Sequence, residues 1–109
     1  AHLGINAPDA ETSLMATKLF CSMFNFPLKE GNSSNFAGKG IEINKSRGLG
    51  EKGHIAIATN SINRAVAWLE RTGIEVDHSS AKKDAGGALV AVYLKKEVSG
   101  FAIHLLQKK

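Results

Sequence analysis

The sequence predicts an α+β fold built from two tandem copies of one unit, in which a strand is followed by a helix and then by three strands. Segments of alternating apolar residues occur in the same order in both halves, and each half has one run of apolar residues at helical spacing. The chain has 109 residues, 43% of them hydrophobic and 22% charged, which suits a single domain with its own core. We therefore treat residues 1–109 as one domain.

The first unit, about residues 1–46, starts with a strand around His2 and continues with a helix over about residues 9–24. Asp9 is an N-cap candidate, because its carboxylate can accept a hydrogen bond from the first helical turn. Three strands are predicted after the helix, at 27–30, 33–37 and 40–45. The helix prediction rests on an apolar stripe formed by Met15, Leu19 and Met23, with Phe20 and Phe24.

The second unit, about residues 53–109, repeats this order with a strand at His54 and a helix over about residues 61–72. Asn60 or Ser61 can cap the start of the helix, and Gly73 suits the position just past its end. Residues 82–87 are predicted to form a polar loop. The helical stripe consists of Ile62, Ala65, Val66 and Leu69. The remaining strands are expected near 74–78, 89–95 and 101–107.

The two units are joined by a linker at about 47–52, within a stretch from Lys45 to Gly53 that holds three glycines and four charged residues. A phosphate-binding loop is the alternative, but the spacing matches no phosphate-loop motif. Gly48 and Gly50 would allow a hinge if the units exchanged between two chains, and the sequence leaves that question open.

Composition excludes several classes of partner. The net charge is +4, but the basic residues are scattered and no nucleic-acid motif occurs, so the lysines indicate a solvated surface that attracts anionic metabolites. The single Cys21 has no partner for a disulfide, which favours a reducing compartment. The longest apolar run, 88–94, is too short to span a membrane. We expect a soluble, cytoplasmic protein without nucleic-acid or membrane partners.

Four predicted strands each carry one side chain that can bind a metal ion, namely His2, Glu42, His54 and His104. Successive side chains of a strand point to opposite faces, so these four residues point away from the apolar residues that flank them. Their neighbours on the same face are small or polar, which leaves room for a cavity. A lone histidine is more often a structural residue than a ligand, but four candidates at corresponding positions favour a metal site.

Three imidazoles and one carboxylate suit zinc, nickel, iron, cobalt or manganese better than calcium, which prefers oxygen ligands. A metabolite with two adjacent oxygens, such as a 2-oxo acid, could chelate an ion in such a site. Glu42 is the only carboxylate among the four, so it would also have to act as the base in any proton transfer. His78 is expected to be exposed and not to bind metal.

The doubled unit, with histidine on the first strand of each copy and a carboxylate or histidine on the last, resembles the vicinal oxygen chelate superfamily. This superfamily includes glyoxalase I, extradiol dioxygenases and bleomycin-resistance proteins. The resemblance implies a cupped mixed sheet with helices on its outer face, and one divalent ion bound by His2, Glu42, His54 and His104. His104 stands where glyoxalase I more commonly has a glutamate that serves as the base, so isomerisation of that type is less secure.

A narrower resemblance concerns the segments 26–34, 53–57 with 59–62, and 100–105. They are similar to a glyoxalase-like domain at the C-terminus of some bacterial 2-keto-3-deoxy-6-phosphogluconate/4-hydroxy-2-oxoglutarate aldolases. The chain begins at Ala1 without a methionine, directly before a ligand strand, which suits a domain taken from a longer protein. The aldolase barrel itself cannot fit into 109 residues, so the resemblance does not imply aldol cleavage by this chain.

Two functions of different classes follow from these observations. The domain is a metal-dependent lyase or isomerase of glyoxalase type that acts on a small oxygenated metabolite, or it is a binding module that forms a homodimer or assembles an attached aldolase. A stand-alone lactoylglutathione-lyase-like protein and a drug-resistance protein are further alternatives. The latter class usually needs a wide aromatic groove, and this chain has few aromatic residues. Whether the domain turns over a substrate is left open by the sequence.

Overall fold

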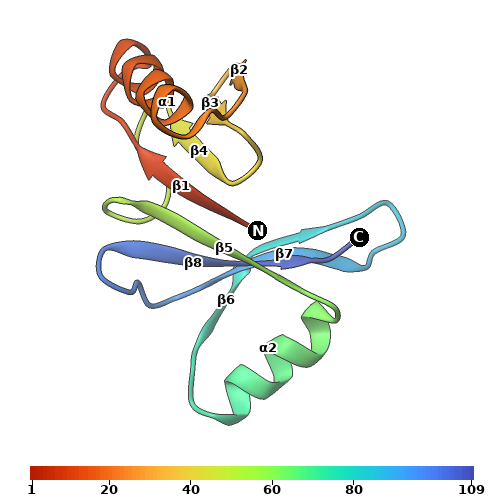
Figure 1. Cartoon of the computed structure of the whole chain (residues 1–109). Coiled ribbons are helices and arrows are strands. Elements are labelled where there is room, and N and C mark those ends of the chain that lie inside the picture. Colours follow the sequence, from red (N-terminus) through yellow and green to blue (C-terminus); the bar gives the residue numbers. More distant parts are fainter.

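The computed structural model describes residues 1–109 and contains two helices and eight strands that form a single mixed sheet (Figure 1). The strand order in the sheet is β2-β3-β4-β1-β5-β8-β7-β6. This arrangement confirms the predicted α+β fold with two strand-helix-three-strand units. The elements are β1 (His2–Asn6), α1 (Ala10–Phe24), β2 (Leu28–Glu30), β3 (Ser34–Ala37), β4 (Ile41–Asn44), β5 (Gly53–Thr59), α2 (Ile62–Arg71), β6 (Val76–Lys83), β7 (Leu89–Leu94) and β8 (Phe101–Gln107).

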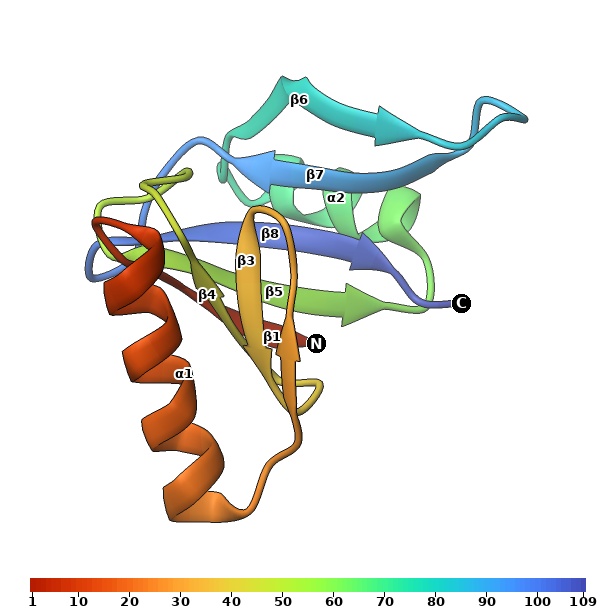
Figure 2. The same ribbon diagram turned by 90° about the horizontal axis from the view of Figure 1, so that it is seen from above.

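The two units meet at the centre of the sheet, where β1 of the first unit pairs antiparallel with β5 of the second. Within each unit the first and last strands are parallel neighbours, β1 with β4 and β5 with β8. The four strands predicted to carry metal ligands therefore lie side by side, in the order β4-β1-β5-β8. Figure 2 shows these strands between the two helices.

Helix α2 covers the second half of the sheet through a conventional apolar core. Ile62 and Val66 pack against residues of three strands, Val76, Val92 and Leu105. The Ser61 hydroxyl accepts a hydrogen bond from the backbone N–H of Arg64, and Gly73 adopts a positive φ of 90° directly after the helix. Both ends of α2 thus agree with the capping residues predicted from the sequence.

Helix α1 packs on the same face of the sheet, but through polar side chains. Ser13 and Thr17 are fully buried, and the Ser13 hydroxyl donates a hydrogen bond of 2.7 Å to the Ile43 carbonyl oxygen. The Asn35 amide of β3 donates to the same hydroxyl at 3.1 Å. These bonds fix the rotation of the helix about its axis, because a buried amide without a partner would be costly.

That rotation turns the apolar stripe of α1 away from the sheet. An apolar stripe on a surface helix ordinarily faces the core. Here Met15, Leu19 and Met23 are each more than 60% exposed. Hydrophobic periodicity therefore locates this helix correctly but does not indicate which of its faces meets the sheet.

Strand β6 is longer than predicted and includes residues 82–83, which were expected to belong to a loop. Its pairing with β7 shifts register between Asp77 and Lys82, so this edge strand contains a bulge. Within the bulge the Ser80 hydroxyl accepts a hydrogen bond from the backbone N–H of Tyr93. A side-chain hydroxyl thus takes the place of a backbone carbonyl as hydrogen-bond acceptor between β6 and β7. The alternation of apolar residues in the sequence does not indicate such a bulge.

Neither helix has the length and apolar character needed to cross a membrane.

Candidate metal centre

Cross-strand pairing brings the four predicted ligands onto two adjacent rows on the face of the sheet that the helices do not cover. We call this the inner face. In one row Gly4 of β1 pairs with Glu42 on one side and with His54 on the other. In the next row Ala56 of β5 lies between His2 and His104 in the same way. Each pair of ligand side chains is thus separated by a residue with a small side chain or none. The large apolar residues that alternate with the ligands, such as Ile43 and Leu105, point to the opposite face, which the helices cover.

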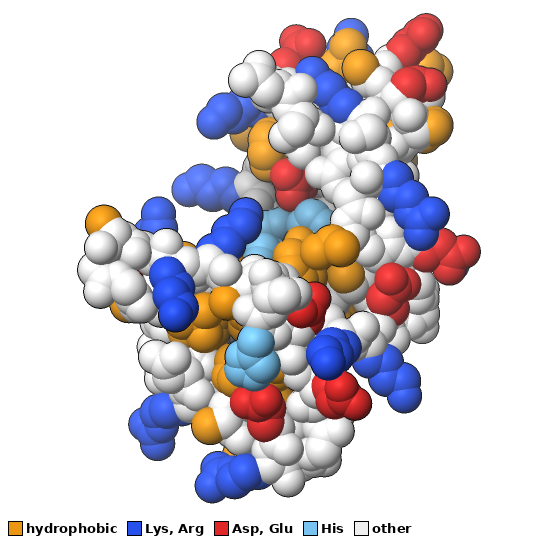
Figure 3. Space-filling view, turned by 180° about the vertical axis from the view of Figure 1, so that it is seen from behind, with side chains coloured by type: hydrophobic (Ala, Val, Ile, Leu, Met, Phe, Trp, Pro, Cys, Tyr) orange, Lys and Arg blue, Asp and Glu red, His pale blue; other side chains and the backbone are white.

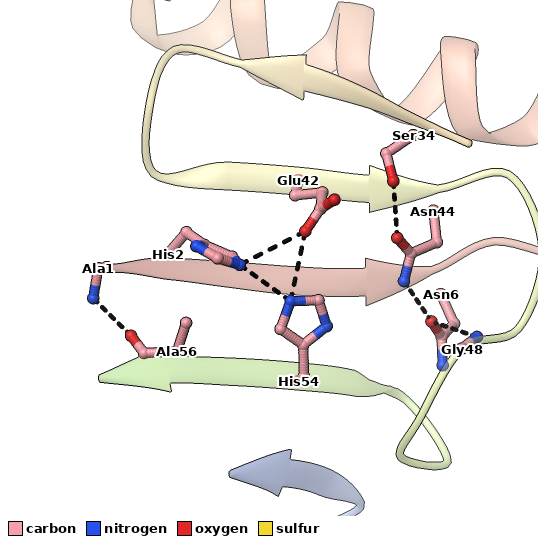
Figure 4. A network of polar contacts seen from close by, with 9 residues as sticks. All are labelled: Ala1, His2, Asn6, Ser34, Glu42, Asn44, Gly48, His54 and Ala56. Carbon is pink, nitrogen blue, oxygen red and sulfur yellow. Dashed lines mark hydrogen bonds and ion pairs between the residues drawn. The ribbon is translucent and has the colours of Figure 1, made fainter. Parts of the chain in front are cut away.

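Three of the four predicted ligands converge on one point (Figure 4). The Nε2 atoms of His2 and His54 are 3.0 Å apart. Glu42 Oε1 lies 3.4 Å from His2 Nε2 and 3.3 Å from His54 Nε2. All three ligand atoms lie within 4.8 Å of one another. Two imidazoles and a carboxylate in this arrangement can enclose a small divalent cation of the borderline type.

The space for this cluster depends on Gly4. A Cβ atom at position 4 would lie only 2.0 Å from Cε1 of His54 and 2.5 Å from its Nε2. Only glycine allows the His54 ring to lie flat over β1 with its Nε2 directed at Glu42. The presence of glycine between two ligand-bearing strands is therefore a structural requirement of the cluster.

His104 lies beside the cluster without belonging to it. Its ring centroid is 6.0 Å from that of His54, and the ring stacks on Tyr93 with centroids 4.1 Å apart and an angle of 3° between the planes. Its Nδ1 atom is buried and has no hydrogen-bond partner. A buried imidazole nitrogen without a partner is uncommon, and here it lies next to three converging ligands.

The electrostatics of the site favour the neutral form of two of its imidazoles, those of His2 and His104. Burial, together with the neighbouring His54, His2 and Lys82, lowers the pKa of His104 to about 4, against the opposing effect of the Glu42 carboxylate. Burial also lowers the pKa of His2, against the opposing effect of the Glu42 carboxylate. Metal ligation requires the neutral imidazole, so both shifts favour ligation at neutral pH. The pKa of the Tyr93 hydroxyl is raised by burial and by the negative charge of Glu42.

The segment predicted as a linker forms part of the wall of this site. The Asn6 amide donates to the Gly50 carbonyl oxygen at 2.9 Å, and Asn6 Oδ1 accepts hydrogen bonds from the Asn44 amide and from the backbone N–H of Gly48 (Figure 4). Ser34 donates to Asn44 and extends the chain of hydrogen bonds to β3. Asn6 and Asn44 are among the polar neighbours that strand parity predicts on the face of the ligands. The hydrogen bonds of Asn6 to Gly48 and Gly50 were not predicted, because they join residues more than 40 positions apart in the sequence.

A cavity of about 260 Å³ opens between this segment and the cluster. The residues that line it include His54, Tyr93 and Arg47, together with the polar residues Ser33, Asn44 and Ser46. Figure 3 shows the histidine side chains in a hollow between the two halves of the molecule, with Lys and Arg side chains at its edge. The immediate surroundings of the cluster are therefore polar and carry positive charge.

Other sequence candidates lie elsewhere. His78 is exposed, its Nε2 lies 3.0 Å from Glu70 Oε2, and it is not one of the three residues that converge. A larger and more open hollow of about 550 Å³ lies on α2 around Trp68, Arg64 and Arg71. Trp68, which lines this hollow, is 58% exposed. This hollow contains no cluster of metal-binding or nucleophilic groups.

No family model matches the sequence, and no curated protein of similar sequence was found. Solved structures nevertheless share the fold over nearly the whole chain. A hypothetical protein from Bacillus halodurans matches with a TM-score of 0.65 and 17% sequence identity, over 99% of this chain and 92% of that chain. Methylmalonyl-CoA epimerase from Mycobacterium tuberculosis matches with a TM-score of 0.61 and 15% identity, over 99% and 86%.

A methylmalonyl-CoA epimerase from Streptomyces coelicolor, solved in complex with 2-nitronate-propionyl-CoA, also matches. Its TM-score is 0.61 at 16% identity, over 98% of this chain and 94% of that chain. At such identities a likeness informs about the fold alone. Together these matches confirm that the chain has the glyoxalase-like fold predicted from its doubled unit.

Proposed function

We propose that this chain is a divalent-metal-binding domain of glyoxalase-like fold whose ion binds a small metabolite with two adjacent oxygens. The observation that carries the proposal is the convergence of His2, Glu42 and His54, whose ligand atoms come from three different strands and lie within 4.8 Å of one another. With these three ligands the ion keeps open positions, as in catalytic rather than structural zinc sites. A fourth protein ligand would close a tetrahedral zinc site but would leave positions free on a six-coordinate ion such as nickel, iron or manganese.

His104 is the fourth ligand in this proposal. Its support is the buried Nδ1 atom without a hydrogen-bond partner and a neutral ring held beside His54. With one carboxylate and three neutral imidazoles, the site would keep a net positive charge around a divalent ion and so attract anions. Zinc, nickel, iron, cobalt and manganese all accept such a donor set.

The cavity beside the cluster supports a small anionic ligand, of which a 2-oxo acid is the simplest example. Arg47 lines this cavity together with His54, and none of the four ion pairs in the structure involves it. A guanidinium group that is not paired with a protein carboxylate is available for the carboxylate of a ligand. The aldolase-associated resemblance of the sequence leads to the same class of metabolite and to an aldolase as the attached partner.

If the domain turns over its ligand, Glu42 is the residue that moves the proton. It contacts both imidazoles through Oε1, and Oε2 makes no hydrogen bond or ion pair. A bound divalent ion would supply Lewis-acid polarisation of a ligand carbonyl. The Oε2 atom would then accept a proton from the carbon next to that carbonyl and return it to a neighbouring carbon of the same ligand, which is the proton transfer of an isomerase of glyoxalase type. A binding module that uses the same cup without turnover is the alternative.

Metal content of the purified chain tests the proposal. The protein is reconstituted with zinc or manganese, freed of loose ions by gel filtration and analysed for bound metal. The parent should retain close to one ion per chain, and His54→Ala should retain essentially none. His78→Ala removes an exposed histidine outside the cluster and should leave the stoichiometry unchanged. Equal metal content in the parent and in His54→Ala would overturn the proposal.

Ligand binding is tested separately by calorimetry on the metal-loaded chain, with pyruvate as the probe and its methyl ester as the neutral control. Pyruvate should bind, the ester should bind at least tenfold more weakly, and Arg47→Ala should remove this preference without changing the metal content. Lys45→Ala, in the same segment but outside the cavity walls, is the matched control. An unchanged preference in Arg47→Ala would refute the assigned role of this arginine.

A further inference from the structure

Helix α1 carries an apolar surface that no other part of the chain covers. Met15 is 63% exposed, and Leu19 and Met23 are each 61% exposed. Phe24 follows at the end of the helix, and its ring centroid lies 5.7 Å from that of Phe26. We call these five residues the α1 apolar surface. The helix packs only against β2, β3 and β4, and Figure 2 shows it standing at the side of the molecule, away from α2.

Helix α2, the equivalent helix of the second unit, does not expose a comparable apolar surface. Helix α2 places its apolar residues on the sheet and four charged or amide side chains elsewhere, with Trp68 as its one large exposed apolar residue. Helix α1 has only two charged residues among fifteen, Glu11 and Lys18. A helix that is apolar on several sides is typically covered on several sides.

We propose that the α1 apolar surface is the interface of a homodimer, in which α1 packs antiparallel against α1 of a second copy. The sequence of the stripe supports a second copy as the partner. Met15, Leu19 and Met23 follow one another at intervals of four residues, so the stripe reads the same in both directions about Leu19. A two-fold axis at Leu19 therefore places Leu19 against its own copy and each Met15 against a Met23. This self-complementarity is what an isologous interface requires.

The geometry of such a contact is a common one. A row of side chains spaced by four residues forms the ridge that interdigitates in the most frequent class of helix packing, with a crossing angle of about −50°. Methionine side chains adapt well to a surface of this kind because they are unbranched and flexible. Two helices with few charges can also approach closely although the whole chain has a net charge of +4.

The size of the surface agrees with a dimer interface. Side chains of this size offer roughly 200 Å² each, so exposed fractions between 39% and 63% give an apolar area on the order of 500 Å². This lies at the upper end of the largest patches found on monomers, about 300–600 Å². A stable interface buries roughly 800 Å² per partner, so these five side chains alone would account for more than half of it. The other exposed apolar residues, such as Ile57, Ile74 and Val98, occur singly.

This dimer is independent of the metal centre. Helix α1 lies on the outer face of the sheet, whereas the metal ligands lie on the inner face. The inner faces of both copies would therefore remain open to solvent. Loss of the dimer should leave metal binding intact, and loss of metal binding should leave the dimer intact.

Light scattering coupled to gel filtration tests the interface on the whole chain. The parent should elute at twice the chain mass of 11.6 kDa, and Leu19→Glu should elute as a monomer with an unchanged circular dichroism spectrum. Trp68→Glu introduces the same charge on the exposed face of α2 and should remain dimeric. A monomeric parent, or a dimer that persists in Leu19→Glu, would contradict the proposal.

The register is tested by crosslinking in a background with Cys21→Ser, which removes the single native thiol. Leu19→Cys lies on the proposed axis and should form a covalent dimer under mild oxidation. Met15→Cys alone should not, whereas a mixture of Met15→Cys and Met23→Cys chains should form a mixed dimer. This test does not depend on whether Leu19→Glu folds. Failure of Leu19→Cys to crosslink in a dimeric sample would rule out the α1 contact.

Discussion

At the scale of single residues, the candidate metal centre depends as much on small side chains as on ligands. Gly4 separates Glu42 from His54, and Ala56 separates His2 from His104. The ligand positions were predictable from the sequence, because strand parity alone brings these four side chains to one face. The requirement for glycine at position 4 was not, because it arises from a close approach between β1 and a ring on β5.

Gly4→Ala should impair metal binding by displacing the His54 ring, since the added Cβ would lie 2.0 Å from it. We expect metal affinity to fall by roughly 10–100-fold and stability by about 1–3 kcal/mol. Competition with a chromophoric chelator measures the affinity. Gly40→Ala is the matched control, because a Cβ at position 40 would meet no atom within 4 Å. Equal affinities for the two variants would show that the His54 position does not depend on Gly4.

His104 makes the stability of the metal-free chain depend on pH. Its pKa falls from 6.5 in the unfolded chain to about 4 in the folded one, mainly because of burial. Between these values the unfolded state binds a proton that the folded state does not, so the free energy of unfolding should fall as the pH decreases from about 6.5 to 4. Urea unfolding at several pH values in the presence of a chelator should show a weaker dependence for His104→Gln. Parallel profiles would exclude His104 as the source.

At the scale of elements, the sequence located both helices and most strands but not how α1 meets the sheet. Alternating apolar residues define the strands at His2, His54 and Phe101–Gln107, and capping residues define the helix ends. The rotation of α1 is decided by hydrogen bonds between Ser13 and Asn35, which are 22 residues apart. The spacing of apolar residues in the sequence does not indicate such a contact. For the same reason it did not predict the bulge that lengthens β6.

Ser13→Ala should therefore destabilise the fold more than its small change in volume implies. It removes the partner of the Asn35 amide, which is buried, and one hydrogen bond to the Ile43 carbonyl oxygen. A buried polar group left without a partner costs about 1–3 kcal/mol. Chemical denaturation should show a loss in this range for Ser13→Ala and little change for Ser22→Ala, an exposed serine on the same helix. A loss below about 0.5 kcal/mol for Ser13→Ala would mean that other contacts orient α1.

At the scale of the whole molecule, the candidate site belongs to both units at once. The first unit contributes His2 and Glu42, and the second contributes His54 and His104. The antiparallel pairing of β1 with β5 brings the two sets together. The segment between the units, predicted as a linker, lies against this junction through Asn6, so its position depends on both halves of the fold.

Because the proposed ion connects strands of both units, its removal should destabilise the entire fold. A ligand present at about 1,000 times its dissociation constant stabilises the native state by roughly 4 kcal/mol. Thermal unfolding should therefore show a melting temperature several degrees lower after treatment with a chelator. The same treatment should have no effect on His54→Ala. An equal response of the parent and this variant would indicate that the chelator acts elsewhere.

The most direct test of the central claim is an anomalous-scattering map from crystals of the chain reconstituted with zinc or manganese. We expect one ion on the inner face, at about 2.0–2.2 Å from Nε2 of His2, Nε2 of His54 and an oxygen of Glu42. A stoichiometric ion found instead between His78 and Glu70, or crystals without an ion on the inner face at saturating metal, would contradict it.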